Sequence, residues 1–187
     1  MTDRELLRAY TESSDAECLG VFLTRYQSSL VRFARRLLGD PEAAQDVVQE
    51  AFLQVARYPR RLLEVDSCHN WLLRVVRNLG VSRIRRDARA RKHTEAYAGT
   101  LREAGAEEAA EGVSGALEAE EVRCRVRAAI DRLSPRYREV LLLKVEEEKS
   151  YRDIAEITGL TVTNVGYLLH RAMKELSVRL NHAKEVL

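Results

Sequence analysis

The chain has 187 residues, of which 32% are charged and 45% are apolar, a composition typical of a folded globular protein with one domain or two small ones. With 6% aromatic residues, 3 Pro and 9 Gly, it has too few turn-forming residues for an all-β fold, and its composition favours helix throughout. The sequence has no apolar run near the ~18 residues of a membrane span, its first residues lack the apolar core of a secretion signal, and its 3 cysteines are scattered. These features argue against a membrane protein, a disulfide scaffold and a zinc ribbon, and we expect a cytoplasmic protein without membrane insertion.

The charge is unevenly distributed, although the formal net charge is only +2. Residues 71–92 hold 8 basic side chains and 1 acidic one, whereas residues 93–121 hold 1 basic and 8 acidic side chains. A basic block of this density is typical of a polyanion site, and the alternative is a solvated helix face. The acidic segment has 4 glycines and little to bury, so we expect a flexible tether between two separate domains, residues 1–92 and 122–187.

Apolar residues at spacings of three and four predict three long helices in the N-terminal domain. They span about residues 15–38, 41–58 and 67–92. Asp40 is the expected N-cap of the second helix, with Pro41 as its first residue. A short loop over residues 61–66 leads to the third helix, which begins at Asp66 or Ser67 as N-cap and carries the basic block.

In the C-terminal domain the same spacing predicts four helices, the first of which contains Val122 to Leu133. Ser134 is the expected N-cap of the second helix, and Ser150 with Asp153 fits a capping box at the start of the third. The fourth helix runs over about residues 162–181.

The segment YRDIAEITGLTVTNVGYLLH, which begins at Tyr151, fits the pattern of a helix-turn-helix. Ala155 is small where the two helices cross, and Gly159 supplies the turn. Four apolar side chains would hold the helices together: Ile154, Leu160, Val165 and Leu168. In a DNA-binding motif the helix after Thr161 enters the major groove, and the alternative is an ordinary helical hairpin.

The chain thus combines a C-terminal helix-turn-helix with an N-terminal helical domain whose third helix is basic. In this combination it resembles the extracytoplasmic-function (ECF) group of bacterial sigma factors, which belongs to the sigma-70 family. The resemblance covers residues 18–92 and 122–180. AQDVVQEAFLQVAR resembles the segment that holds the clamp helices of core RNA polymerase. WLLRVVRNLGVSRIRR resembles the segment that melts promoters and reads the −10 element. LSPRYREVLLLK, followed by SYRDIAEITGLT, resembles the segment that contacts the −35 element and the polymerase flap.

The resemblance implies an all-α transcription initiation factor with two small helical domains, which directs core RNA polymerase to promoter DNA and is controlled by an anti-sigma factor. The residues themselves indicate no enzyme, because the 4 histidines are scattered and the sequence has neither a nucleophile–base pair nor a phosphate-binding glycine loop. We expect no cofactor and no metal.

The candidate site residues fall into three groups. The candidates for binding core polymerase are Asp46, Gln49, Glu50 and Phe52. The candidates for −10 DNA are His69, Asn70, Trp71, Arg74, Asn78, Arg83, Arg85 and Arg86. The candidates for −35 DNA are Thr161, Thr163, Asn164, Tyr167, His170, Arg171 and Lys174.

Several of these residues fit a second role. The edge formed by Asp46 and Glu50 suits a basic partner surface, but it also suits plain solvation. Phe52 fits the core better than a contact with a partner. Trp71 would stack on an unpaired base or pack in the core, with the core favoured. Tyr167 would contact a base edge or be buried.

The sequence also departs from the pattern of the family. Where recognition helices of the family usually carry basic or small polar residues, this chain has Gly166, Tyr167, Leu168 and Met173. The usual pair of a glycine and a hydrophobic residue before the Ser-Tyr is Glu148-Lys149, which follows two more glutamates. We expect this acidic cluster to face away from DNA, where it would suit a regulator.

These departures leave two rival functions open. One is a stand-alone DNA-binding regulator, with the first domain as a dimeriser or a sensor. The other is an interaction protein that holds polymerase without reading promoters.

Overall fold

The computed structural model describes the backbone of residues 1–95 and 116–185 and the side chains of residues 1–90 and 122–180. These residues form helices and no strand. The N-terminal unit contains α1 (Asp3–Ser13), α2 (Ala16–Leu38), α3 (Pro41–Arg57), α4 (Arg60–Leu63) and α5 (Cys68–Glu95). The C-terminal unit contains α6 (Ala116–Asp131), α7 (Pro135–Val145), α8 (Tyr151–Thr158) and α9 (Val162–Glu185). The predicted all-α architecture of two helical units is confirmed.

The predicted helix boundaries follow from local capping. Asp40 caps α3 by accepting hydrogen bonds from the amides of Glu42 and Ala43 at 2.9 and 3.1 Å, and Pro41 is the first helical residue. Ser150 and Asp153 form the expected capping box at the start of α8. Gly159 ends α8 with φ at +73°, a conformation that favours glycine.

Three helical segments differ from the prediction. The helix α1 was not predicted; a capping box at Thr2 begins it, and it buries Leu6 and Leu7 against α2. Residues expected in a loop form the single-turn helix α4, which buries Leu62. Finally, α6 begins at Ala116, inside the predicted tether; the rest of that tether lies mostly outside the described residues.

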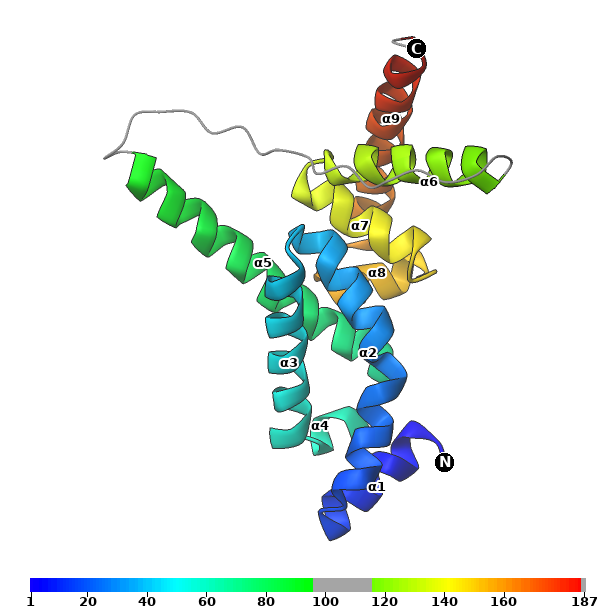
Figure 1. Ribbon diagram of the computed structural model, residues 1–187. Coiled ribbons are helices and arrows are strands. Elements are labelled where there is room, and N and C mark those ends of the chain that lie inside the picture. The colour runs from blue at the N-terminus through cyan, green and yellow to red at the C-terminus, as the bar shows by residue number, and fades with distance from the viewer. Residues whose placement is uncertain (96–115, 186–187) are drawn as a thin grey trace.

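Within each unit the helices pack around apolar side chains. In the N-terminal unit, α2 lies at the centre and contacts α1, α3 and α5, with Phe22, Phe33 and Leu72 fully buried. In the C-terminal unit, α9 contacts α6, α7 and α8. Figure 1 shows the end of α5 projecting away from the body, with α9 on another side of the molecule.

The two units also pack against each other, which the prediction of two separate tethered domains did not include. Helix α5 contacts α8, and α2 contacts α7, so that the buried apolar residues of both units form one continuous cluster. Toward the arginine-rich end of α5, Arg85, Arg86 and Arg89 are exposed.

Candidate nucleic-acid interface

The outer face of α9 and its N-cap, Thr161, carry every residue predicted to contact −35 DNA. All of them are exposed: Thr161, Thr163, Asn164, Tyr167, His170, Arg171 and Lys174. The hydroxyl of Thr161 accepts a hydrogen bond from the amide of Asn164 at 3.2 Å and so caps the helix. Tyr167 has an exposed fraction of 59%, so it is not buried and is accessible for contact with a base edge. This face therefore presents hydroxyl, amide and cationic groups together, which are the groups that read base edges and phosphates.

The inner face of α9 has the packing of a helix-turn-helix. Ile154 of α8 and Val165 of α9 are fully buried, and Leu168 is buried beside them. Leu160 packs partly against the same cluster. Because α8 is held to α9 by these side chains, the orientation of the exposed α9 face is fixed by the core of the C-terminal unit.

Two of the departures from the family pattern in this helix point inward. A β-carbon at Gly166 would lie 3.7 Å from the ring of Tyr151, and Leu168 belongs to the buried cluster. Only Tyr167 and Met173 among the four unusual residues are exposed. The unusual composition of α9 is thus partly a feature of its packing and changes its exposed surface less than the sequence indicates.

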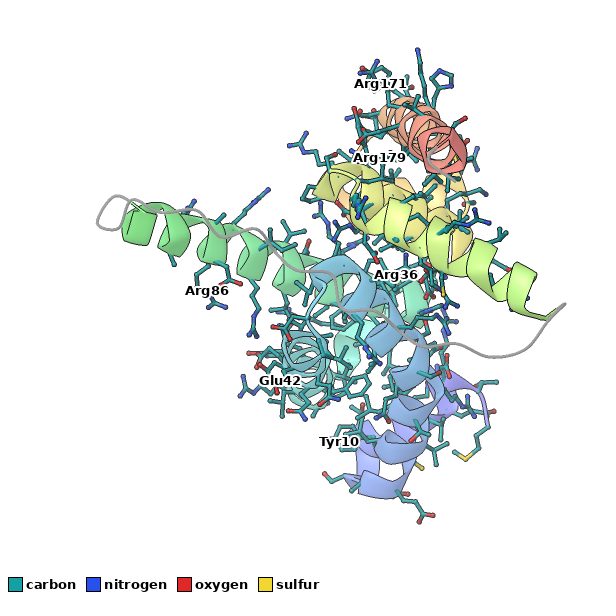
Figure 2. The ribbon with its side chains drawn as sticks, turned by 45° about the horizontal axis from the view of Figure 1, so that its top comes forward. Tyr10, Arg36, Glu42, Arg86, Arg171 and Arg179 are labelled. Carbon is teal, nitrogen blue, oxygen red and sulfur yellow. The ribbon has the colours of Figure 1, made fainter. Side chains whose placement is uncertain are left out.

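The predicted −10 face of α5 divides into two halves. Toward the C-terminal end, Arg85 and Arg86 are exposed and form no ion pair among the described residues, and Figure 2 shows Arg86 on the projecting part of the helix. Asn78 is also exposed, and its side-chain oxygen accepts a hydrogen bond from Arg77. Toward the N-terminal end, the helix is covered by α7 and α8.

Three residues in the covered half of α5 bind acidic side chains of the C-terminal unit. The amide nitrogen of Asn70 donates to Asp153 Oδ1 at 2.7 Å, and only 4% of Asn70 is exposed. Arg74 Nη2 donates to Glu156 Oε1 at 2.8 Å. Arg77 forms a two-bond ion pair with the buried Glu139. The sequence analysis missed these acidic residues, because they lie 62 to 83 positions away along the chain.

The acidic cluster before α8 also contacts the N-terminal unit. The hydroxyl of Ser29 donates to Glu147 Oε2 at 2.6 Å, with His69 Nε2 at 3.3 Å from the same oxygen and Arg32 Nη2 at 3.4 Å from the other. Although burial opposes ionisation, the hydrogen bonds from His69 and Ser29 and the charge of Arg32 hold the pKa of Glu147 below its ordinary value. Lys149 Nζ lies 3.0 Å from His69 Nδ1 on the other side of the ring. This cluster thus faces α2 and the start of α5.

Further ion pairs join α2 to the C-terminal unit through Arg36, which lies between them in Figure 2. Its guanidinium is 3.3 Å from Asp131 and 3.1 Å from Glu146. The second carboxyl oxygen of Glu146 is buried without a hydrogen-bond partner. Burial therefore raises the pKa of Glu146, and the charge of Arg36 offsets this only in part.

The predicted polymerase-binding residues lie on α3. Asp46 and Gln49 are exposed and Glu50 is half-buried, whereas Phe52 packs partly against the core, as its alternative role predicted. The exposed apolar residue on this helix is Leu53, with an exposed fraction of 49%. The sequence analysis missed Leu53, although it lies seven positions after Asp46 and so on the same face.

Asp46 also contacts a residue of the −10 group. Its Oδ2 lies 3.0 Å from Arg83 Nη1. The structure therefore joins two candidate sites that the sequence analysis treated separately. Trp71 is half-buried and packs partly against the core, in agreement with the favoured alternative.

The described residues include no metal-holding cluster, no disulfide and no helix that could span a membrane. No group of three or more His, Cys, Asp or Glu residues within them is placed to hold a metal ion. The cysteines are all free, with Cys68 buried, Cys18 half-buried and Cys124 exposed. None of the described helices is both long enough and apolar enough to cross a membrane.

Comparison with known proteins identifies the family. The sigma-70 region 2 model matches residues 22–90, and the sigma-70 region 4 model matches residues 125–176. The ECF RNA polymerase sigma factor EcfG of Rhodopseudomonas palustris is 34% identical over 159 residues, which cover 81% of this chain and 79% of EcfG. SigW of Bacillus subtilis, another ECF sigma factor, is 27% identical over 184 residues, covering 90% of this chain and 92% of its own.

Solved structures show the same fold. The sigma factor RpoE of Bartonella quintana, determined in complex with the anti-sigma factor NepR, matches with a TM-score of 0.67 at 24% identity, over 85% of this chain and 94% of its own. CnrH, determined in complex with the cytosolic domain of CnrY, matches with a TM-score of 0.63 at 24% identity, over 96% of this chain and 97% of its own.

The two matched regions, in this order and on these helices, define a protein of the sigma-70 class. Within that class the chain belongs to the ECF RNA polymerase sigma factors. It is therefore a factor of transcription initiation that acts with RNA polymerase.

Proposed function

We propose that this ECF sigma factor divides promoter recognition between its two units. The N-terminal unit, residues 1–92, binds core RNA polymerase through α3 and captures melted −10 DNA through α5. The C-terminal unit, residues 122–187, places α9 at the −35 element and contacts the polymerase flap. The polymerase forms every bond, and the factor itself is not an enzyme. The observation that supports this division most directly is the exposure of all seven −35 candidates along α9 and at its N-cap. Figure 1 shows α9 away from the projecting end of α5.

The outer face of α3 fits the role of polymerase contact because it combines acidic, amide and apolar groups. Asp46, Gln49 and Leu53 are exposed there, with Glu50 beside them. Acidic groups around an exposed leucine suit a basic partner surface that also buries some apolar area. Phe52 contributes by packing beneath this face, so we assign it a supporting role in the proposed contact.

We also propose that an anti-sigma factor controls this protein in the cytoplasm. Support comes from the neighbour RpoE, which has the same fold and was determined in complex with the anti-sigma factor NepR. A two-unit factor whose units already contact each other offers such a regulator one continuous surface.

In vitro transcription with core polymerase on genomic fragments tests the proposed function. The proposal expects initiation at discrete sites only when the factor is present. A stand-alone regulator would bind specific duplex DNA tightly without polymerase and would start no transcripts. An interaction protein that does not read promoters would bind polymerase and also start none, so either of these results would contradict the proposal.

Co-purification with core polymerase tests the α3 face separately. The double variant Asp46→Arg, Glu50→Arg should lose core polymerase, because it reverses both acidic charges on this face. Arg83→Ala is the matched control, since it removes the same Asp46–Arg83 ion pair but leaves α3 unchanged. Retention of polymerase by the double variant, or equal loss in the control, would exclude this face as the contact.

A further inference from the structure

We propose that acidic residues on α7 and α8 occupy the −10 face of α5 in the free factor and must be displaced before that face can hold DNA. The proposal rests on the assignment of −10 binding to α5. It makes the C-terminal unit an internal partner that competes with the promoter for the same residues. These acidic residues, which we call the acidic edge, are Glu139, Asp153 and Glu156.

The geometry shows a row of donors meeting a row of acceptors. Asn70, Arg74 and Arg77 follow each other at spacings of four and three, so they lie along one face of α5. Each donates to a different carboxylate of the acidic edge, and the Asn70–Asp153 and Arg74–Glu156 bonds measure 2.7 and 2.8 Å. The contact is therefore continuous over about two turns of the helix.

The chemistry of these contacts is the chemistry of phosphate binding. A carboxylate and a phosphate both accept charge-assisted hydrogen bonds from guanidinium groups in the same forked geometry. Arg77 holds Glu139 with two such bonds, the arrangement that a phosphate would take. An arginine that is so engaged has its donors directed at the carboxylate, so DNA gains the contact only when the carboxylate leaves.

The contact between the acidic edge and α5 covers only part of the DNA-binding surface. Arg85 and Arg86 are exposed, as is the entire candidate −35 face of α9. The internal partner thus blocks the residues nearest the start of α5 and leaves the other two regions accessible. We expect the free factor to touch duplex DNA through these regions while its −10 face is closed.

The contact has the features of a reversible one. Arg74 and Glu156 are both substantially exposed, and such pairs contribute only about 0–1 kcal/mol. The units are incompletely packed beside the Arg77–Glu139 pair, since that pair lines a cavity of about 720 Å³ between α5 and the helices α7 and α9. Arg74 Nε is also buried without a partner. Opening the arrangement also separates the buried Arg77–Glu139 pair and the apolar contacts of the two units, so it requires a partner whose own contacts compensate for them.

Two variants with equal net charge test the proposal in the full chain. Glu139→Gln with Glu156→Gln weakens the acidic edge, and Asp153 stays because it also caps α8. Glu148→Gln with Glu175→Gln is the control: Glu148 is exposed and pairs with no described residue of the N-terminal unit, and Glu175 pairs with Arg179 within α9.

The first measurement is the affinity for a mixed-sequence single-stranded DNA of about 20 nucleotides, by fluorescence anisotropy at low salt. We expect the edge variant to bind at least about fivefold more tightly than the control, because loss of the exposed Arg74–Glu156 pair alone removes up to about 1 kcal/mol of internal contact. Equal affinity of the two variants, or weaker binding by the edge variant, would overturn the proposal.

The second measurement is the radius of gyration from small-angle X-ray scattering, which requires no DNA. The edge variant should be larger than the control, and the wild type should expand as salt is raised, because its interdomain ion pairs are screened. Equal radii would overturn the proposal even if the DNA affinities differed. Transcription with core polymerase distinguishes the two proposals. If the wild type starts transcripts but the edge variant and the control have equal DNA affinities and radii, only the internal competition is contradicted. If the wild type starts no transcripts, the proposed function is contradicted.

Discussion

Glu148 has a backbone conformation that glycine adopts far more readily, and it stands where the family usually has glycine. Its φ is +51°, and it lies in the short segment between α7 and α8. The amide of Lys149 donates to the carbonyl of Leu143 at 3.0 Å, so the chain turns back onto the end of α7 at this left-handed residue. We therefore predict that Glu148→Gly stabilises the protein.

The magnitude follows from two opposing contributions. A residue with a β-carbon in the left-handed region costs about 1–2 kcal/mol, whereas glycine costs about 0.5–1 kcal/mol in additional chain entropy. The net gain in the free energy of unfolding is about 0.5–1 kcal/mol. Loss of the carboxylate adds little, since Glu148 is exposed and forms no ion pair among the described residues.

Urea unfolding followed by far-ultraviolet circular dichroism measures this gain as a higher midpoint at constant slope. Glu148→Ala is the first control: it removes the charge but keeps the β-carbon, so its stability should stay within about 0.5 kcal/mol of the wild type. Gly159→Ala is the reverse change at φ +73°, where a methyl group meets no atom within 4 Å, and it should cost about 1 kcal/mol or more. A lower midpoint for Glu148→Gly, or an equal gain for Glu148→Ala, would refute the conformational explanation.

The other predictions use different forces. Near neutral pH, Glu147→Gln should lower the thermal midpoint and Glu146→Gln should raise it, because the pKa of Glu147 is lowered and that of Glu146 is raised. Ionised Glu147 stabilises the fold above the ordinary pKa of 4.5, and this stabilisation is lost as the pH falls through its lowered pKa. Ionised Glu146 destabilises the fold, and this destabilisation grows as the pH rises through its raised pKa. Both differences in thermal midpoint should therefore disappear in acid. Arg85→Ala with Arg86→Ala should reduce the salt dependence of promoter binding by the holoenzyme, by a slope of up to ~0.9 for each lost duplex phosphate contact, and an unchanged slope would exclude these arginines. Ile154→Ala should cost about 2–5 kcal/mol in urea unfolding, since the side chain is fully buried.

The features that the sequence predicted are those determined by nearby residues. Asp40 with Pro41, the Ser150–Asp153 capping box and the left-handed Gly159 each act within four positions, so their residue types alone indicate where helices begin and end. The exposed face of α9 was predictable for the same reason. Once Val165 and Leu168 are assigned to the core, helical periodicity places Asn164, Tyr167 and Arg171 outside.

The contact between the units was not predictable, because its partners are distant in sequence and lack a local signature. Glu139 and Glu156 look like ordinary solvated residues on amphipathic helices, and only the tertiary structure places them against Arg77 and Arg74. The positive φ of Glu148 was also missed. The sequence shows that the usual family glycine is replaced, but a glutamate carries no local signal that it keeps the backbone conformation of that glycine.

The structure changes what the charge of α5 means for DNA binding. Counting side chains assigns all of its arginines to one polyanion site, but Arg74, Arg77 and Arg83 are each paired with a carboxylate. Arg85 and Arg86, by contrast, are free among the described residues. A paired arginine must lose its carboxylate partner before it can bind a phosphate and release counterions from DNA. The free energy lost with the ion pair offsets the free energy gained from counterion release. The salt dependence of the free factor should therefore reflect the exposed end of α5, and the paired arginines should contribute only where polymerase or DNA has separated the two units.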